Sequence, residues 1–237
     1  ELEACEQTKV VVLAGEGGIW SAGQDLKEYF RALEDRPAEA KRIRLVSNGW
    51  QWDRIYMFNK PTIAMVEGYC VGGAFTHMIA ADFAISAEET QFSLSEVNWG
   101  ILPGGMVAKA VADALSYRDA LYYACLGEPF DGKEAARIRL VNYAVPQAQL
   151  KEEVTKLARK LMTKSPAALR ATKQVMRQVR QMDFGQAADY MQEKRMAISV
   201  GDPERSYHTG LQQFLDEKSY KPVERPFTLK NEREGTR

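Results

Sequence analysis

The sequence predicts an α/β domain with a largely parallel sheet and a helical C-terminal region. Short runs of β-branched residues recur in the first part of the chain, and each is followed by a glycine-rich or polar turn and then by residues at helical spacing. Strands that alternate with helices favour parallel pairing. After residue 145 the patterns are helical. We therefore divide the chain into an α/β core, 1–145, and a helical region, 146–237.

Composition limits the function classes. The 237 residues are 45% hydrophobic and 27% charged, which is typical of one soluble globular domain with a full core. Lys plus Arg equals Asp plus Glu at 32 each, so no charge excess favours nucleic acid or an anionic membrane. Three scattered cysteines without a CxxC pair indicate neither disulfides nor a zinc site. With no signal peptide and no run of about 20 apolar residues, we expect a cytoplasmic protein.

The first elements are one strand and two helical segments. Lys9–Ala14 (KVVVLA) is a β-branched run that ends in a Gly-Glu-Gly-Gly turn, as a buried strand does. Asp25–Glu34 carries apolar residues at helical spacing. Ala38–Phe58 continues as a long amphipathic helix, and Pro61 follows its end.

Glycines separate the elements of the middle region. Thr62–Glu67 is predicted to be a second buried strand, and Gly72-Gly73 opens a short apolar helix, Ala74–Ala81. Asp82–Ser86 and Gln91–Leu94 are the next strands, and Glu96–Gly105 is a loop rich in turn formers.

Later segments carry apolar residues three and four apart and predict helices, with one further strand among them, Val141–Val145. The helices are Met106–Leu115, Tyr117–Cys125, Asp131–Ile138 and Leu150–Thr163. Ser165-Pro166 and Asp202-Pro203 both have the N-cap and proline pattern of a helix start. Glu224–Arg237 is a charged segment that we expect to be a loose tail.

Four segments resemble the successive signatures of the crotonase (enoyl-CoA hydratase/isomerase) superfamily: Ser21–Leu26, Gly68–Gly73, Ala81-Asp82 and Phe92–Gly104. The resemblance implies the crotonase (ClpP/crotonase-like) fold, which is a β-β-α superhelix with a C-terminal helical trimerisation region. It also implies an acyl-CoA thioester substrate, of which coenzyme A is a part, so that no separate cofactor is expected. With two histidines and no His/Cys cluster, no metal site is expected either. A homotrimer or a hexamer is the implied assembly.

The same resemblance implies an oxyanion hole made by the backbone N–H groups of Gln24 and Gly73. Gly73 stands where a glycine turn enters a helix, so its N–H is free for a ligand. Only a residue without a β-carbon lets the thioester approach that closely. Ala22 and Leu26 are expected to offer backbone contacts to the CoA.

Glu96 is the predicted general acid and base. Hydratases of this superfamily have a second glutamate at the position that Thr76 occupies here, so a simple two-carboxylate hydratase is disfavoured. The alternative is that Glu96 only caps its loop or pairs with a nearby base.

Further blocks closely resemble the hydroxycinnamoyl-CoA hydratase-lyases, which hydrate feruloyl-CoA or 4-coumaroyl-CoA and cleave the product to an aromatic aldehyde and acetyl-CoA. These blocks are Asp25–Phe30, Trp50–Trp52, Ser95–Gly100 and Phe214–Ser219. Tyr29 matches a phenol-binding tyrosine of that family, although it could instead only cover the core. The second such tyrosine falls at Gln192, which can form a hydrogen bond but cannot ionise. Thr76, Ser95 and Trp99 complete the predicted substrate-binding set.

Two other functions stay open, and the sequence differs from the family pattern before its first strand. The first rival is a single-glutamate enoyl-CoA hydratase or isomerase for another acyl group, and the second is a catalytically silent CoA-binding scaffold. Family members have a β-hairpin and a helix before the strand Lys9–Ala14, and these are not in the sequence. We therefore expect a longer natural chain and an exposed sheet edge. His77 is expected to be a packed or solvent-bridging side chain rather than a base.

Overall fold

A computed structural model describes residues 1–221 and residue 228. The chain forms two compact units. The larger comprises Val11–Phe58 and Thr62–Leu157, and the smaller comprises Glu1–Val10, Asn59–Pro61 and the described residues from Ala158 on. The division of the sequence at residue 145 stays a prediction.

Four parallel strands form the main sheet of the larger unit, in the order β1-β2-β4-β6. All four were predicted from the sequence: β1 (Val11–Ala14), β2 (Thr62–Val66), β4 (Phe83–Ala87) and β6 (Tyr143–Val145). Ile63, Ala64 and Val66 of β2 are fully buried, as expected for a parallel strand with both faces covered. β1 lies at the edge of this sheet, and its Val12 is exposed.

A second, two-stranded parallel sheet pairs β3 (Tyr69–Val71) with β5 (Gln91–Ser93). Ser21 extends it through a parallel bridge to Cys70: the Ser21 N–H donates to the Tyr69 carbonyl at 2.9 Å, and the Val71 N–H donates to the Ser21 carbonyl at 3.2 Å. The sequence predicted β5 but not β3. Three residues between Gly68 and Gly72 are too few for a detectable period of two.

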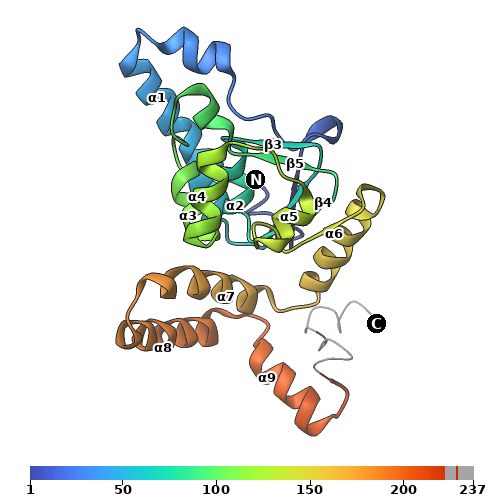
Figure 1. Ribbon diagram of the computed structural model, residues 1–237. Coiled ribbons are helices and arrows are strands. Elements are labelled where there is room, and N and C mark those ends of the chain that lie inside the picture. The colour runs from blue at the N-terminus through green and yellow to red at the C-terminus, as the bar shows by residue number, and fades with distance from the viewer. Residues whose placement is uncertain (222–227, 229–237) are drawn as a thin grey trace. The chain divides into compact units, whose positions relative to one another are not determined.

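The chain of the larger unit repeats a strand, strand, helix order. Figure 1 labels β3, β4 and β5 of these strands and the helices that follow them. After β2 and β3 comes α2 (Ala74–Ala80). After β4 and β5 come α3 (Val107–Ala114), α4 (Tyr117–Leu126) and α5 (Gly132–Arg137), before the chain returns to β6. The hydrophobic core of this unit includes Phe92. Its ring stacks on Phe130 with centroids 5.6 Å apart and meets Phe75 edge to face.

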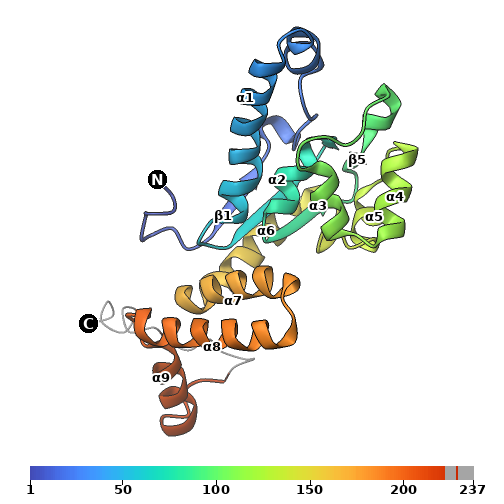
Figure 2. The same cartoon turned by 90° about the vertical axis from the view of Figure 1, so that its left-hand side faces the viewer.

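The predicted helical segments before β2 are present, with local variations. Asp25–Glu34 is a π turn, Leu26–Phe30, that continues into a 3₁₀ turn, Arg31–Leu33. Its start is capped by the Asp25 carboxylate, which accepts from the N–H groups of Lys27 and Glu28. The long helix is α1 (Pro37–Asn48), seen from the side in Figure 2, and a further π turn follows it, Gly49–Arg54.

The smaller unit is helical. The helix α6 (Gln147–Met162) ends within it, and α7 (Pro166–Gln178) lies beside α8 (Phe184–Gly201), with the short α9 (Ser206–Leu211) following (Figures 1 and 2). Ser165 caps α7 as predicted and accepts from the Ala168 N–H. The prediction of a helix start at Asp202-Pro203 is wrong: the Asp202 carboxylate accepts from the N–H groups of Glu204 and Ser206, so it caps a turn that precedes α9.

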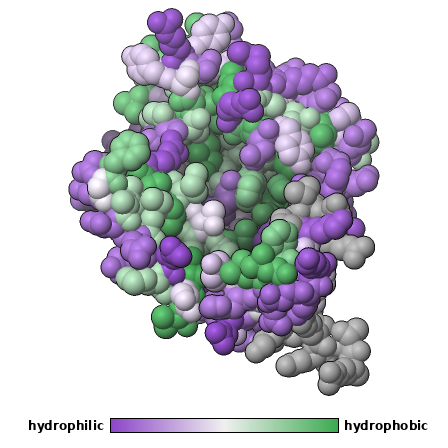
Figure 3. All heavy atoms as spheres, turned by 90° about the horizontal axis from the view of Figure 1, so that it is seen from below, coloured by the Kyte–Doolittle hydropathy of each residue, from purple (hydrophilic) through white to green (hydrophobic). Residues whose placement is uncertain are grey.

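Two negative findings apply to the described part of the chain. No helix there is long and apolar enough to cross a membrane, and no group of three or more His, Cys, Asp and Glu side chains could hold a metal ion. Hydrophilic residues are frequent around the periphery of the face in Figure 3, with hydrophobic residues between them. The predicted tail Glu224–Arg237 lies outside the described residues, apart from Thr228.

Gly132 provides a test of the packing of α5 against β4. A β-carbon at Gly132 would lie 2.0 Å from the Ala87 carbonyl oxygen, so the backbone must shift to accept one. We expect Gly132→Ala to destabilise the fold by about 2 kcal/mol or more, which lowers Tm by roughly 4 °C or more. Thermal unfolding followed by circular dichroism measures this.

The matched control is Gly49→Ala. A β-carbon at Gly49 would have no neighbour within 4 Å, and the residue lies in a helical segment. The substitution is expected to leave the stability unchanged or to raise it by up to about 1 kcal/mol, so Tm stays the same or rises. Equal Tm values for the two alanine variants would contradict the packing described here.

Candidate active site

A cavity of about 680 Å³ opens in the larger unit. Its lining comes from the loop after Ser21, the turns Leu26–Leu33, one face of α1, the start of α2 and the segment Ser95–Val107. It includes nine predicted site residues: Ala22, Gln24, Leu26, Tyr29, Gly73, Thr76, Ser95, Glu96 and Trp99. The tenth, Gln192, lies on α8 in the smaller unit, and its role stays a prediction.

Parallel pairing brings three of these residues together. Ser21, β3 and β5 run in the same direction, so their carboxyl ends meet at one edge. Gln24 follows the first segment, Gly73 follows β3, and Glu96 follows β5. Binding sites in α/β proteins commonly form at the carboxyl ends of parallel strands. Residues 49 and 23 positions apart in the sequence thus line one cavity.

Two glycines shape the turn after β3. Gly72 has φ +52°, and its N–H donates to the Ser93 carbonyl at 2.9 Å, which ties the turn to β5. Gly73 then begins α2 with φ −52°. On the other side of the turn, a β-carbon at Gly23 would lie 2.6 Å from the Val71 carbonyl oxygen, so only glycine lets the first loop lie this close.

The backbone N–H groups of Gln24 and Gly73 form no hydrogen bond to any residue that the structure describes. Both residues line the cavity. Free N–H groups at a cavity wall are suited to hold an oxygen that gains negative charge. Their role as the oxyanion hole remains the prediction made from the sequence.

Glu96 carries a half-buried carboxyl group, and among the described residues no other carboxylate lines the cavity. Its Oε1 atom lies 3.1 Å from the point that a β-carbon on Gly72 would occupy, and its Oε2 atom is buried without a hydrogen-bond partner. Burial raises the pKa of Glu96. A raised pKa makes the carboxyl group easier to protonate, which suits a group that both takes up and releases a proton.

Asn98, two residues after Glu96, holds this loop in place. Its side-chain amide donates to the Gly127 carbonyl at 2.9 Å, at the end of α4. Gly127 has φ +63°, and a β-carbon there would lie 2.8 Å from the Asn98 amide. The sequence analysis missed this anchor, because its two members lie 29 residues apart and neither is unusual alone.

Aromatic side chains border the cavity. Tyr29 lines it and meets Phe30 edge to face at 5.0 Å, while Trp99 is 63% exposed at its rim. Trp52 stacks on Tyr56 at 4.9 Å and is not part of the lining.

His77 is packed, as expected. Its ring stacks on Trp20 at 4.9 Å, and burial lowers its pKa to about 4, so it is neutral at pH 7.

One wall of the cavity was not predicted. Arg44, Ser47, Asn48 and Gln51 line it from one face of α1 and the π turn after it. The spacing of three, four and seven residues places polar side chains on one helical face, and this was a usable signal. The sequence analysis treated that helix only as an amphipathic element.

The family pattern of enoyl-CoA hydratase/isomerase matches residues 1–223. The chain belongs to this family. A hydroxycinnamoyl-CoA hydratase-lyase of Pseudomonas fluorescens is 46% identical over 225 residues, which cover 93% of this chain and 82% of the relative. A 2,3-dehydroadipyl-CoA hydratase of Escherichia coli K12 is 29% identical over 92% of this chain and 84% of its own.

Solved structures of the family are similar as well. An enoyl-CoA hydratase of Geobacillus kaustophilus superposes with a TM-score of 0.82 at 27% identity, over 91% of this chain and 80% of the other. One from Bacillus anthracis has a TM-score of 0.81 at 25% identity, over 94% and 83%. The crotonase fold predicted from the sequence is confirmed, and the family implies an acyl-CoA substrate.

Gly72→Ala tests the approach of Glu96 to the glycine turn. A β-carbon would meet the Glu96 carboxylate at 3.1 Å and displace it. Because small displacements of a reacting group are costly, we expect kcat to fall by about 10- to 100-fold. Steady-state kinetics with the acyl-CoA substrate measures this.

Gly17→Ala is the control for backbone strain. Gly17 has φ +68°, similar to Gly72, but nothing lies within 4 Å of the added β-carbon and the residue is not part of the cavity lining. Both variants are expected to lose stability, and only Gly72→Ala is expected to lose kcat. Equal kcat values would show that Glu96 does not depend on Gly72.

Proposed function

We propose that this protein is a hydroxycinnamoyl-CoA hydratase-lyase, which converts feruloyl-CoA or 4-coumaroyl-CoA into an aromatic aldehyde and acetyl-CoA. The observation that carries the proposal is the arrangement in one cavity of a single carboxyl group, Glu96, two free N–H groups and a tyrosine. The 46% identity to the Pseudomonas fluorescens hydratase-lyase supports the same substrate class.

In the hydration step, Glu96 takes a proton from water as the water oxygen bonds to the β-carbon. The electron pair of the double bond moves to the thioester, whose oxygen accepts hydrogen bonds from the N–H groups of Gln24 and Gly73. Glu96 then returns the proton to the α-carbon. A single carboxyl group suffices because it gives back the proton that it takes.

In the cleavage step, the Glu96 carboxylate takes the proton of the new β-hydroxyl group. The bond between the α- and β-carbons breaks, the aldehyde forms, and the electron pair remains on acetyl-CoA as its enolate. The same two N–H groups hold this enolate until Glu96 protonates the α-carbon. One oxyanion site thus serves both steps.

Tyr29 is the proposed partner of the phenol of the substrate. A para hydroxyl group donates electrons through the ring to the β-carbon, so a hydrogen bond at that hydroxyl influences both steps. Ala22 and Leu26 are proposed to contact the CoA, and Thr76, Ser95 and Trp99 to line the acyl group. Gln192 is proposed as a second hydrogen-bonding group for the phenol.

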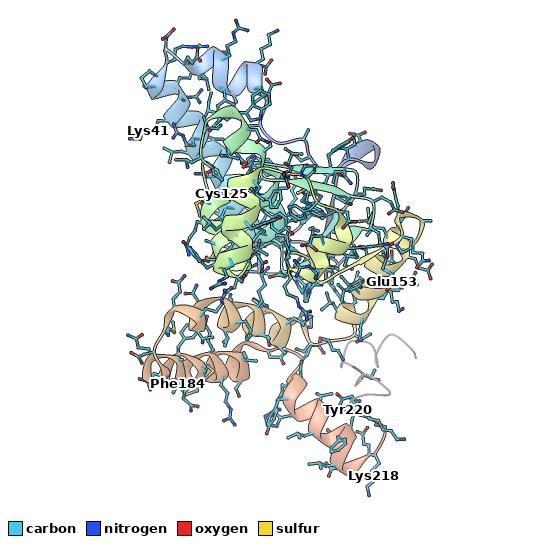
Figure 4. The ribbon with its side chains drawn as sticks, in the orientation of Figure 1. Lys41, Cys125, Glu153, Phe184, Lys218 and Tyr220 are labelled. Atoms are coloured by element: carbon cyan, nitrogen blue, oxygen red, sulfur yellow. The ribbon has the colours of Figure 1, made fainter. Side chains whose placement is uncertain are left out.

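We infer a cytoplasmic homotrimer or hexamer that needs no cofactor besides the CoA of its substrate. The smaller unit supports an assembly, since several of its apolar side chains are exposed. Phe184, labelled in Figure 4, is 98% exposed at the start of α8, Val200 is 90% exposed and Met176 is 62% exposed.

The decisive experiment incubates the protein with feruloyl-CoA and with 4-coumaroyl-CoA. It follows the loss of the conjugated thioester absorbance and assays the aromatic aldehyde and acetyl-CoA. Aldehyde in equal amount to acetyl-CoA is the expected result. A hydroxyacyl-CoA as the end product would identify a hydratase, turnover of crotonyl-CoA alone would identify an aliphatic substrate, and binding without turnover would identify a silent homologue.

Glu96→Gln tests the proton transfer. The amide keeps the shape of the side chain but moves no proton, so kcat is expected to fall by about 10²- to 10⁴-fold while the Kd for the thioester changes only a few-fold. Stopped-flow absorbance and a binding titration measure the two quantities. A wild-type rate would exclude Glu96 from the mechanism.

The raised pKa of Glu96 leads to two further expectations for the wild-type protein and the Glu96→Gln variant. The base form is lost as pH falls through the raised pKa, so the acidic limb of kcat/KM is expected above the ordinary glutamate range. The folded state disfavours the ionised carboxylate, so Glu96→Gln is expected to raise Tm by a few degrees at most, with a difference that grows as pH rises through that pKa. A Tm difference that is largest at low pH would contradict this.

Tyr29→Phe tests recognition of the phenol. We expect kcat/KM for 4-coumaroyl-CoA to fall by about 3- to 10-fold, which corresponds to one hydrogen bond, and that for cinnamoyl-CoA hydration to change little. The substrate without the hydroxyl group is the control. Equal losses for both thioesters would show that Tyr29 only packs.

A further inference from the structure

We propose that the side-chain carboxamide of Gln24 is a third hydrogen-bond donor to the thioester oxygen, in addition to the backbone N–H groups of Gln24 and Gly73. The inference rests on the proposed function for its substrate. It differs from the oxyanion hole described above, because any residue except proline supplies a backbone N–H at position 24, and few supply a donor at the end of the side chain.

The carboxamide lies directly against the oxyanion turn. The position of a β-carbon on Gly73 is 3.2 Å from Gln24 Cγ, 3.6 Å from Nε2 and 3.8 Å from Cδ. Gln24 is half-buried and lines the cavity. The side chain therefore fills the space over the α-carbon of Gly73, whose N–H is the second predicted oxyanion donor, and the amide nitrogen is nearer to this point than Cδ is.

The Gln24 amide forms no hydrogen bond to any residue of 1–221 or 228. The side-chain amide of Asn98 differs in this respect, because it already donates its hydrogen bond to the Gly127 carbonyl. Partly buried amides usually find a partner. Gln24 lines the cavity, so a ligand there can supply the partner, and an acceptor with growing negative charge fits an amide donor.

The backbone on both sides of Gln24 is restrained. Ser21 is bridged to β3, and the Gly23 N–H donates to the Ser21 hydroxyl at 3.2 Å. Asp25 begins the next turn and accepts from the N–H groups of Lys27 and Glu28 at 2.8 and 2.7 Å. The side chain thus starts from a fixed backbone, and a preorganised donor stabilises charge without reorganising during the reaction.

Glu96 and Gln24 approach two adjacent glycines, since the Glu96 carboxylate lies against Gly72 and the Gln24 amide against Gly73. A neutral donor suits this place, because a second ionisable group beside Glu96 would change the pKa of the acid and base. The amide would donate to the enolate oxygen, which is more negative than the thioester oxygen of the ground state. Its effect is therefore expected on kcat more than on substrate binding.

The test compares Gln24→Met with Gln24→Glu. Methionine keeps the length of the side chain and removes the donor, whereas glutamate keeps the shape and places negative charge beside the forming enolate. We expect kcat to fall about 10-fold or more for Gln24→Met and further for Gln24→Glu, with the thioester Kd within a few-fold of wild type for the methionine variant. Gln91→Met and Gln91→Glu, at an exposed position on β5 outside the lining, are matched controls expected to keep wild-type kcat.

A second measurement keeps this inference separate from the lyase assignment. Solvent deuterium exchange at the α-carbon of acetyl-CoA or 3-phenylpropanoyl-CoA, followed by NMR, reports enolate formation without any cleavage. The same order, wild type above methionine above glutamate, is expected for the exchange rate. If the three proteins show this order of exchange rates but the wild-type protein yields no aldehyde, only the hydratase-lyase proposal is overturned.

Three results would overturn the role of the Gln24 amide. These are a methionine variant with wild-type kcat and exchange, a glutamate variant equal to wild type, and wild-type protein that catalyses no exchange. Circular dichroism and Tm of each variant check the fold. If Gln24→Glu fails to fold, the methionine variant and its exchange rate still decide the question.

Discussion

The active-site arrangement depends on parallel pairing between three very short segments. Ser21 bridges to β3, and β3 pairs with β5, so each segment ends at the same edge. Three residues per strand provide few hydrogen bonds, and the pairing holds because the strands are covered by a core that includes Phe75 and Phe92. Burial of that core is what fixes the positions of Gln24, Gly73 and Glu96, which no local interaction would bring together.

Glycine and burial act together at this edge. Gly23 and Gly72 have positive φ values, and at each the missing β-carbon makes room, for the Val71 carbonyl at one and for the Glu96 carboxylate at the other. The carboxylate then sits with Oε2 buried and unpartnered, which costs stability in its ionised form. The same burial raises its pKa. The features that make Glu96 suitable for proton transfer are therefore unfavourable for the fold, as is common at functional sites.

Much of this was predictable from the sequence, and the failures have physical reasons. The strands of the main sheet are apolar runs flanked by turns, and Ser165-Pro166 marks a helix start correctly. β3 was missed because a three-residue strand carries no periodicity, and Asp202-Pro203 misled because an aspartate that caps a turn has the same sequence signature as one that caps a helix. The anchor from Asn98 to Gly127 depends on a tertiary contact that local patterns do not encode. The polar face of α1 carried a usable spacing signal, but tertiary packing determines which cavity that face lines.

Each of the three segments places its candidate catalytic residue two or three positions after its last paired residue. Backbone hydrogen bonds between the strands determine where the pairing ends. The side chain that follows has little effect on these hydrogen bonds. If the proposed oxyanion hole is correct, the side chains at position 24, at the helix position Thr76 and at position 96 can therefore vary one at a time while the two backbone N–H groups stay in place. The fold separates the part of the chemistry that every thioester substrate needs from the part that selects the reaction, and a lineage can explore new reactions without rebuilding the first part.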